Sequence, residues 1–235
     1  LAVAGLSACN GSNSKSSETA NASSRSNAAE KPNIVIMLTD DQGYGDMNCY
    51  GNLRLQTPNL DKLAAEGVRF TNFYAGAAAS TPSRAALLTG RYAERAGLQG
   101  VVDYLSENGL ESDEFTLADY LKQNNYATGI FGKWHLGLGG PNGPDWNGEI
   151  TPSPRNIGFD YDFVIPATVD RVPCVYVEND RVVNLDPKDP IFVDYNKKVG
   201  NWPTGKENPE LLKMKSSHGH DNTIINGIGR IGYMT

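Results

Sequence analysis

The chain has 235 residues, of which 39% are hydrophobic and 20% charged, so it is long enough to bury a core in one large domain or two small ones. Its formal net charge is -6, and no dense block of Lys and Arg occurs. These features exclude a nucleic-acid partner, because proteins that bind nucleic acids neutralise the phosphates with a basic patch.

The N-terminal segment differs in composition from the rest. Residues 1–8 are small and apolar, and Leu6-Ser7-Ala8-Cys9 has the form of a lipobox, where bacterial lipoprotein precursors are cleaved and Cys9 is lipidated. Residues 9–30 are rich in Ser, Asn and Ala, which is typical of a flexible tether. A chance cysteine after a small apolar stretch is the alternative. We predict a signal-peptide remnant, a tether, and an exported protein that is lipid-anchored in the bacterial cell envelope, on the periplasmic side or at the cell surface.

The folded part is predicted to begin at residue 31 with a strand. The run NIVIMLTDD, residues 33–41, is apolar over the length of a strand and ends in Asp40 and Asp41. Such a run is typical of a strand that is buried on both faces in a parallel sheet. A short helix is predicted next, with Thr57 as cap, Pro58 at the first helical position and Gly67 as its end.

The next elements lead to a hydroxyl at the start of a helix. VRFTNFY, residues 68–74, alternates between apolar and polar residues and predicts a second strand. A loop of small residues then reaches Ser80, and a helix is predicted from about Pro82 to Thr89. Ser80 or Thr81 could simply cap this helix, which is the commoner role for a hydroxyl before a proline.

A third strand and helix repeat the scheme. Thr116 is predicted to cap a helix, and residues 127–131 to form a strand that Lys133 and His135 follow. Strands that alternate with helices predict an α/β fold, with a mixed, largely parallel sheet flanked by helices. In such folds the ligand crevice lies outside the carboxyl ends of the strands, so separate segments are predicted to converge there.

The side chains at this predicted edge complement one another chemically. Asp40 and Asp41 offer the hard oxygen ligands that Ca²⁺ or Mg²⁺ prefers. The helix that begins near Ser80 offers N–H groups to a sulfuryl or phosphoryl group, and Arg84 can bond its oxygens in a fork. Lys133 adds positive charge, and His135 can move a proton. Each residue alone also fits a structural or solvated role, but together they predict a hydrolase of anionic esters.

Four sequence blocks resemble the successive signatures of the sulfatase family, over about residues 31–163. Ser80-Thr81-Pro82-Ser83-Arg84 fits the serine version of the family motif. The fold implied by the resemblance is the N-terminal part of the alkaline-phosphatase-like sulfatase domain. The blocks are PNIVIMLTDDQGYGD, TPNLDKLAAEGVRFTNFY, STPSRAALLTGRY and GIFGKWHLG.

The resemblance implies a chemistry and partners. In the family this serine is oxidised to formylglycine, whose hydrate attacks the sulfur of the ester and later releases sulfate. By matching position, Asp40, Asp41 and the oxidised Ser80 would bind Ca²⁺, while Arg84, Lys133 and His135 would hold the formylglycine and the sulfate oxygens. The serine form implies maturation by a radical-type oxidising enzyme. The implied substrate is a sulfated glycan or an aryl sulfate.

The downstream part departs from the family pattern. Asn179-Asp180 lies in VYVENDRVV, which predicts a hairpin turn and not a further pair of metal ligands. His218, His220 and Asp221 could contact substrate, although histidines in such loops are more often solvated. Because family members are usually much longer, we expect residues 31–235 to be a C-terminally truncated catalytic domain that is inactive as it stands.

Two other functions stay open at this point. A phosphoester or phosphonate hydrolase of the same superfamily would use plain serine as its nucleophile. An inactive, truncated lipoprotein that binds glycans would use none of the chemistry described above.

Overall fold

The computed structural model describes residues 31–102, 109–168, 171, 173–193 and 231–232. The chain divides into two compact units, Leu1–Ala75 and Gly76–Thr235, and each is described by itself. The predicted signal-peptide remnant, the lipidation at Cys9, the tether, and the candidate substrate residues His218 and His220 lie outside the described residues.

The first unit contains short helices, and its α-helix is the predicted one. α1 (Pro58–Glu66) follows the short 3₁₀ helices η1 (Tyr44–Asp46) and η2 (Asn48–Tyr50). Pro58 is the first helical residue, and the Gly67 N–H donates to the Leu63 carbonyl at 2.9 Å where the helix ends. Thr57 holds the N-cap position, but its hydroxyl donates to the Asp61 carboxylate at 3.0 Å and accepts from the Asn48 N–H at 2.9 Å, so it caps no N–H of α1.

The two strands predicted in the first unit do not form. Apart from a single bridge at Ile36, residues 33–41 and 68–74 make no ladder within the described residues, and Ile34 to Met37 are 39 to 49% exposed. Near the second segment, backbone carbonyls accept from side chains: the Tyr50 hydroxyl donates to the Phe70 carbonyl at 2.8 Å. An apolar run supplies only one side of a strand pair, and a ladder also needs a neighbouring strand to satisfy its backbone groups.

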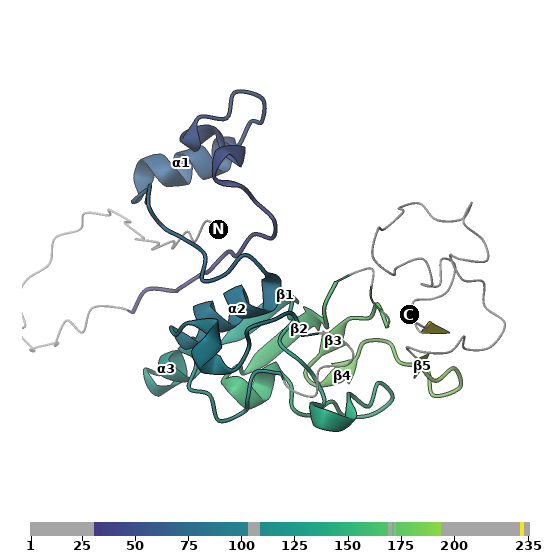
Figure 1. Cartoon of the computed structure of the whole chain (residues 1–235). Helices are drawn as coiled ribbons and strands as arrows, with labels where there is room; N and C mark the ends of the chain where they lie inside the picture. Colours follow the sequence, from purple (N-terminus) through teal and green to yellow (C-terminus); the bar gives the residue numbers. More distant parts are fainter. Residues whose placement is uncertain (1–30, 103–108, 169–170, 172, 194–230, 233–235) are drawn as a thin grey trace, which may run out of the picture. The chain divides into compact units, whose positions relative to one another are not determined.

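The second unit is a mixed α/β arrangement in which α2 and α3 lie toward the β1 edge of the sheet (Figure 1). The four-stranded sheet has the order β1-β2-β3-β4, with one parallel and two antiparallel pairs, and β5 pairs with β6 in parallel. The predicted mixed sheet flanked by helices is therefore confirmed. The elements are α2 (Ser80–Thr89), η3 (Ala93–Ala96), α3 (Leu117–Gln123), β1 (Gly129–Lys133), η4 (Gly140–Asn142), η5 (Pro154–Ile157), β2 (Tyr161–Ile165), β3 (Val177–Glu178), β4 (Arg181–Val182), β5 (Phe192–Val193) and β6 (Ile231–Gly232).

Local signals placed several of these elements correctly. Thr116 caps α3 in a capping box, in which its hydroxyl accepts from the Asp119 N–H. Asn179 and Asp180 both have positive φ, 44° and 71°, and form the predicted turn between β3 and β4. β1 lies two residues later than predicted, so it ends at Lys133 itself.

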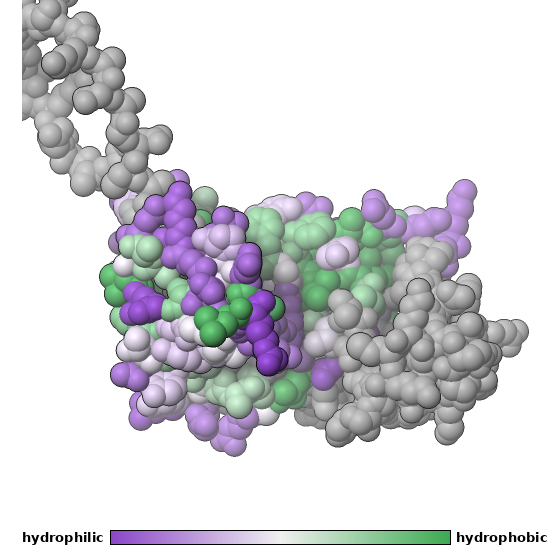
Figure 2. Space-filling model, turned by 90° about the horizontal axis from the view of Figure 1, so that it is seen from above, coloured by the Kyte–Doolittle hydropathy of each residue, from purple (hydrophilic) through white to green (hydrophobic). Residues whose placement is uncertain are grey.

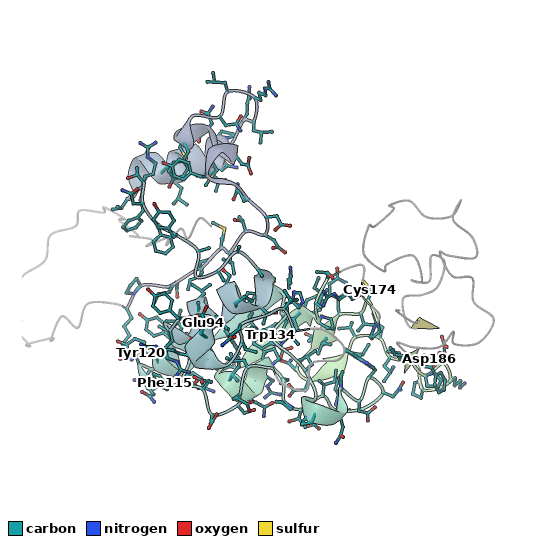
Figure 3. All side chains as sticks on the ribbon, in the orientation of Figure 1. Glu94, Phe115, Tyr120, Trp134, Cys174 and Asp186 are labelled. Atoms are coloured by element: carbon teal, nitrogen blue, oxygen red, sulfur yellow. The ribbon has the colours of Figure 1, made fainter. Side chains whose placement is uncertain are left out.

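The core of the second unit lies around Trp134, which is 2% exposed and sits in its interior (Figure 3). Trp146, in a segment rich in Gly and Pro at residues 139–154, packs partly against the same cluster. At the surface of the described part, hydrophobic residues lie beside hydrophilic ones in the view of Figure 2. The buried apolar cluster consists of Ala85, Ala96, Leu98, Leu110, Trp134, Leu136, Ile150, Ile157, Val164, Val175, Val177, Val182 and Ile191.

The chain just after β1 is held from two sides. The Trp134 N–H donates to the Ile165 carbonyl at 3.0 Å, so the pairing with β2 continues past the strand end. On the other side, the Leu110 N–H donates to the Leu136 carbonyl at 2.8 Å. Gly109 permits this approach, because a Cβ there would lie 2.4 Å from the Leu136 carbonyl oxygen. Of the helices in the described residues, none is long and apolar enough to cross a membrane.

Candidate active site

Ser80 is the first residue of α2, which begins two residues earlier than predicted, so the alternative role of helix cap does not apply to it. Ala79 holds the N-cap position in an extended conformation, with φ −103° and ψ 156°. The Ser80 hydroxyl instead accepts from Arg84 Nε at 3.0 Å, one helical turn further on. Because the first N–H groups of a helix have no intrahelical acceptor, this hydroxyl lies where an anion is favoured.

Arg84 connects the start of α2 to the end of β1. While its Nε donates to Ser80, its Nη1 donates to the Lys133 carbonyl at 2.7 Å. A planar guanidinium with two of its donors fixed in this way keeps a defined direction. Arg84 therefore orients the Ser80 hydroxyl against the strand that carries Lys133.

Thr81, and not Ser80, has the structural role at this helix start. Its side chain is fully buried, and its hydroxyl donates to the His135 carbonyl at 2.8 Å and accepts from the Val102 N–H at 3.0 Å. A hydroxyl can do both at once, because it carries one proton and two lone pairs. Of the two adjacent hydroxyls, Thr81 therefore takes the structural role, and Ser80 is left as the candidate reacting group.

His135 is held in an unusual backbone conformation. Its φ of 57° is positive, which is uncommon for a residue other than glycine. Its N–H donates to the Pro166 carbonyl at 3.0 Å, while its carbonyl accepts from Thr81. The backbone of His135 is therefore fixed on both sides, and its side chain has little freedom of position.

The imidazole of His135 is buried among positive charges. The residue is 4% exposed, and Arg171 Nη1 lies 3.2 Å from its Nε2. Burial, followed by the charges of Arg171 and Lys133, lowers the pKa of His135 to about 4. The imidazole is therefore neutral at pH 7, and the positive charges around it favour an anionic ligand.

Arg171 is the site residue that the sequence did not reveal. It lies in no recognisable motif, and its separation from His135 along the chain hides the contact. The signal that finds it is three-dimensional: its Nη1 reaches both His135 and the Val102 carbonyl, the latter also at 3.2 Å. Arg84 thus joins Ser80 to the backbone of Lys133, and Thr81 and Arg171 hold His135, two residues further along the chain.

Asp40 and Asp41 lie in the first unit, and both are exposed. Asp41 has a φ of 52°, and the side-chain oxygens Thr39 Oγ1 and Gln42 Oε1 beside the pair are buried without a hydrogen-bond partner in the described residues. This set of hard oxygen atoms fits a cation such as Ca²⁺. Within the described residues no three His, Cys, Asp or Glu side chains gather closely enough to hold a metal, so further ligands are required. That the pair joins Ser80 in one metal site stays a prediction.

The sequence model of the sulfatase family matches residues 32–173, which includes Ser80, Arg84, Lys133 and His135. The chain belongs to the sulfatase family. The resemblance carried by the four sequence blocks is thereby confirmed.

Relatives within the family place this sulfatase near bacterial enzymes. It is 59% identical over 207 residues to an N-acetylgalactosamine-6-O-sulfatase of Bacteroides thetaiotaomicron, a match that covers 88% of this chain and 40% of the relative. It is 48% identical over 147 residues to human arylsulfatase A, and this match covers 62% of this chain and 27% of the relative. This chain therefore spans less than half the length of either relative.

A solved structure supports the same fold assignment. This structure comes from work on the metabolism of multiple glycosaminoglycans by Bacteroides thetaiotaomicron. It matches this chain with a TM-score of 0.75 and 61% sequence identity. The match covers 83% of this chain and 41% of that one. The architecture of the chain is therefore that of a sulfatase.

Proposed function

We propose that this sulfatase, in the full-length natural protein that carries the chain, hydrolyses sulfate esters with Ser80 as its reacting residue. The observation that carries the proposal is the position of Ser80 at the first turn of α2. There its hydroxyl is bonded to Arg84, which also holds the end of β1, next to the buried, neutral His135. Helix N–H groups and the Arg84 guanidinium at one hydroxyl suit the oxygens of a sulfate group.

Each residue of the site has a distinct task in this proposal. Arg84 orients the Ser80 side chain and donates to the sulfate oxygens. The positive charge of Lys133 attracts the same sulfate group, and neutral His135 forms a hydrogen bond with the reacting group. Oxidation of Ser80 to formylglycine would supply a carbonyl carbon that can bear two hydroxyls. Ca²⁺, or alternatively Mg²⁺, held by Asp40, Asp41 and the oxidised Ser80 would supply a Lewis acid.

A sulfated glycan is the proposed substrate class. The support is the name of a relative, an N-acetylgalactosamine-6-O-sulfatase that is 59% identical over 207 residues. A 6-O-sulfated N-acetylgalactosamine is accordingly the first sugar to test, with an aryl sulfate as a general reporter substrate.

The location and the maturation partner are also part of the proposal. The lipobox ending at Cys9 supports an exported protein with a lipid anchor in the bacterial envelope. The serine in place of cysteine at position 80 supports maturation by a radical-type enzyme. Labelling of the native host with a fatty-acid probe would test the anchor, and Cys9→Ser should abolish the label.

The decisive experiment combines mass spectrometry with kinetics on the full-length protein from its native host. The peptide that contains Ser80 should carry the mass of formylglycine, and aryl sulfate should be hydrolysed in preference to aryl phosphate. Ser80→Ala should abolish turnover. Thr89→Ala is the matched control, because its hydroxyl bonds Ala85 and Arg91 at the far end of α2 and should be dispensable for turnover. Unmodified Ser80 together with preferred phosphate turnover would identify a phosphoester hydrolase instead.

A further inference from the structure

We propose that Arg171 is a positioning residue of this site, which holds His135 in the tautomer that carries its proton on Nδ1 and so presents this N–H to the oxygens of the bound ester. The inference rests on the proposed sulfate-ester hydrolysis for its ligand, but its structural part can be tested without activity.

The contact between Arg171 and His135 fixes which ring nitrogen accepts. Arg171 Nη1 lies 3.2 Å from His135 Nε2, and a guanidinium nitrogen can only donate. Nε2 must therefore contribute its lone pair. A neutral imidazole carries its single proton on the other nitrogen, so the proton of His135 lies on Nδ1.

The surroundings keep the imidazole neutral. His135 is almost completely buried, and the charges of Arg171, Lys133 and Arg84 act on it. A second proton on Nε2 would also face the Arg171 guanidinium directly, donor against donor. The Val102 carbonyl acts in the opposite direction and raises the pKa of the ring, but this carbonyl already accepts from Arg171 Nη1. With the Val102 carbonyl bonded to Arg171, the contact between Arg171 and Nε2 favours the Nδ1–H form.

The Nδ1–H group has no acceptor among the residues that the structure describes. Its nitrogen is buried in a residue that is 4% exposed. More than about nine in ten buried polar groups in proteins have a hydrogen-bond partner, so this exception calls for one. An oxygen of the reacting group or of the sulfate itself would be that partner.

Arg171 is itself well placed to hold this arrangement. Its Nη1 also donates to the Val102 carbonyl, and the Val102 N–H donates to Thr81, whose hydroxyl donates to the His135 carbonyl. These contacts form a closed ring that returns to His135. Moving Arg171 therefore changes the state of the imidazole and leaves its backbone anchored through Thr81.

The first test reads the tautomer by nuclear magnetic resonance. Long-range ¹⁵N–¹H spectra distinguish protonated from unprotonated ring nitrogens, and the chain has only three histidines. Loss of a signal in His135→Gln assigns the ring. We expect Nδ1 to be protonated and Nε2 not. In Arg171→Met the Nε2–H form should appear, and Arg171→Lys should restore part of the original pattern because its ammonium still donates.

The control is Arg181→Met, which removes an exposed guanidinium paired with Glu149 and should leave the His135 signals unchanged. A His135 ring that carries its proton on Nε2 in the unaltered protein overturns the proposal. So does an unchanged tautomer in a folded Arg171→Met variant. If that variant does not fold, the same spectrum is recorded for Arg171→Leu, whose side chain has no donor, and an unchanged tautomer there counts against the proposal equally.

The second test measures the consequence in the full-length protein. Arg171→Met should lower kcat/KM for the sulfate ester by at least about tenfold. This is the smallest loss typical of residues that orient a side chain which itself contacts the ligand. Arg171→Lys should recover part of this loss. A shifted tautomer with unchanged kcat/KM would overturn the role of the Nδ1–H group. An inactive unaltered protein would count against the proposed function alone, since the tautomer would still have been measured.

Discussion

Replacement of Asp162 by asparagine should stabilise the chain at neutral pH but not at acid pH. Asp162 lies on the core side of β2, is fully buried, and neither of its carboxylate oxygens has a hydrogen-bond partner in the described residues. Burial, and secondarily the charge of Asp180, raises the pKa of Asp162 from an ordinary 3.8 to about 6. The fold therefore favours the protonated carboxyl.

The difference between the two pKa values of Asp162 sets the direction and the size of the pH effect on the free energy of unfolding. Between pH 4 and pH 6 the folded protein keeps a proton at Asp162 that the unfolded chain has lost, so the free energy of unfolding falls as the pH rises through this window. The pKa values differ by about two pH units. At 1.36 kcal/mol per unit, the penalty above pH 6 is roughly 3 kcal/mol. An asparagine side chain at this position has no charge to desolvate and would avoid this penalty.

The assay is urea unfolding of both proteins from pH 4 to pH 8, followed by tryptophan fluorescence. The stability gain of Asp162→Asn should be small at pH 4 and grow by about 3 kcal/mol by pH 7. Asp160→Asn is the control of opposite sign, because the Thr128 backbone and Lys122 hold the pKa of the Asp160 carboxyl below its usual range. That variant should lose stability at pH 7 and approach the unaltered protein in acid. A gain from Asp162→Asn that is the same at all pH values would refute the reasoning.

Three further predictions concern hydroxyls and a guanidinium. Thr81→Val removes the partner of two backbone groups in the interior and should lower the free energy of unfolding by about 2 to 5 kcal/mol in urea titrations. Thr89→Val also removes two bonds, to Ala85 and Arg91, but should cost far less because Thr89 is only half-buried and water can replace them. Equal losses would contradict the role given to Thr81. Arg84→Lys should lower sulfate-ester turnover of the full-length protein roughly a hundredfold with an unchanged circular dichroism spectrum, because lysine cannot bond Ser80 and the strand end together. Near-normal turnover would remove Arg84 from the site. Thr116→Ala should cost about 1 kcal/mol in thermal unfolding, and no change would mean that its capping box is not formed in solution.

Local patterns predicted the elements whose determinants lie close together in the sequence. The proline at the start of α1, the capping box of α3 and the turn between β3 and β4 each depend on residues a few positions apart. The strands predicted at residues 33–41 and 68–74 failed, because a ladder depends on a neighbour that no local pattern can supply. The same apolar run is compatible with a buried strand or an extended segment.

The sequence by itself determined the family and most residues of the candidate site, since Ser80, Arg84, Lys133 and His135 lie in motifs with fixed spacing. Only the tertiary structure decided how these residues share the work. It assigned the structural bonds to Thr81, left the Ser80 hydroxyl to Arg84, and placed Arg171 against His135. The physical reason is that a hydrogen bond requires a distance and a direction between two atoms, and residues far apart in the chain acquire these only when the fold brings them together.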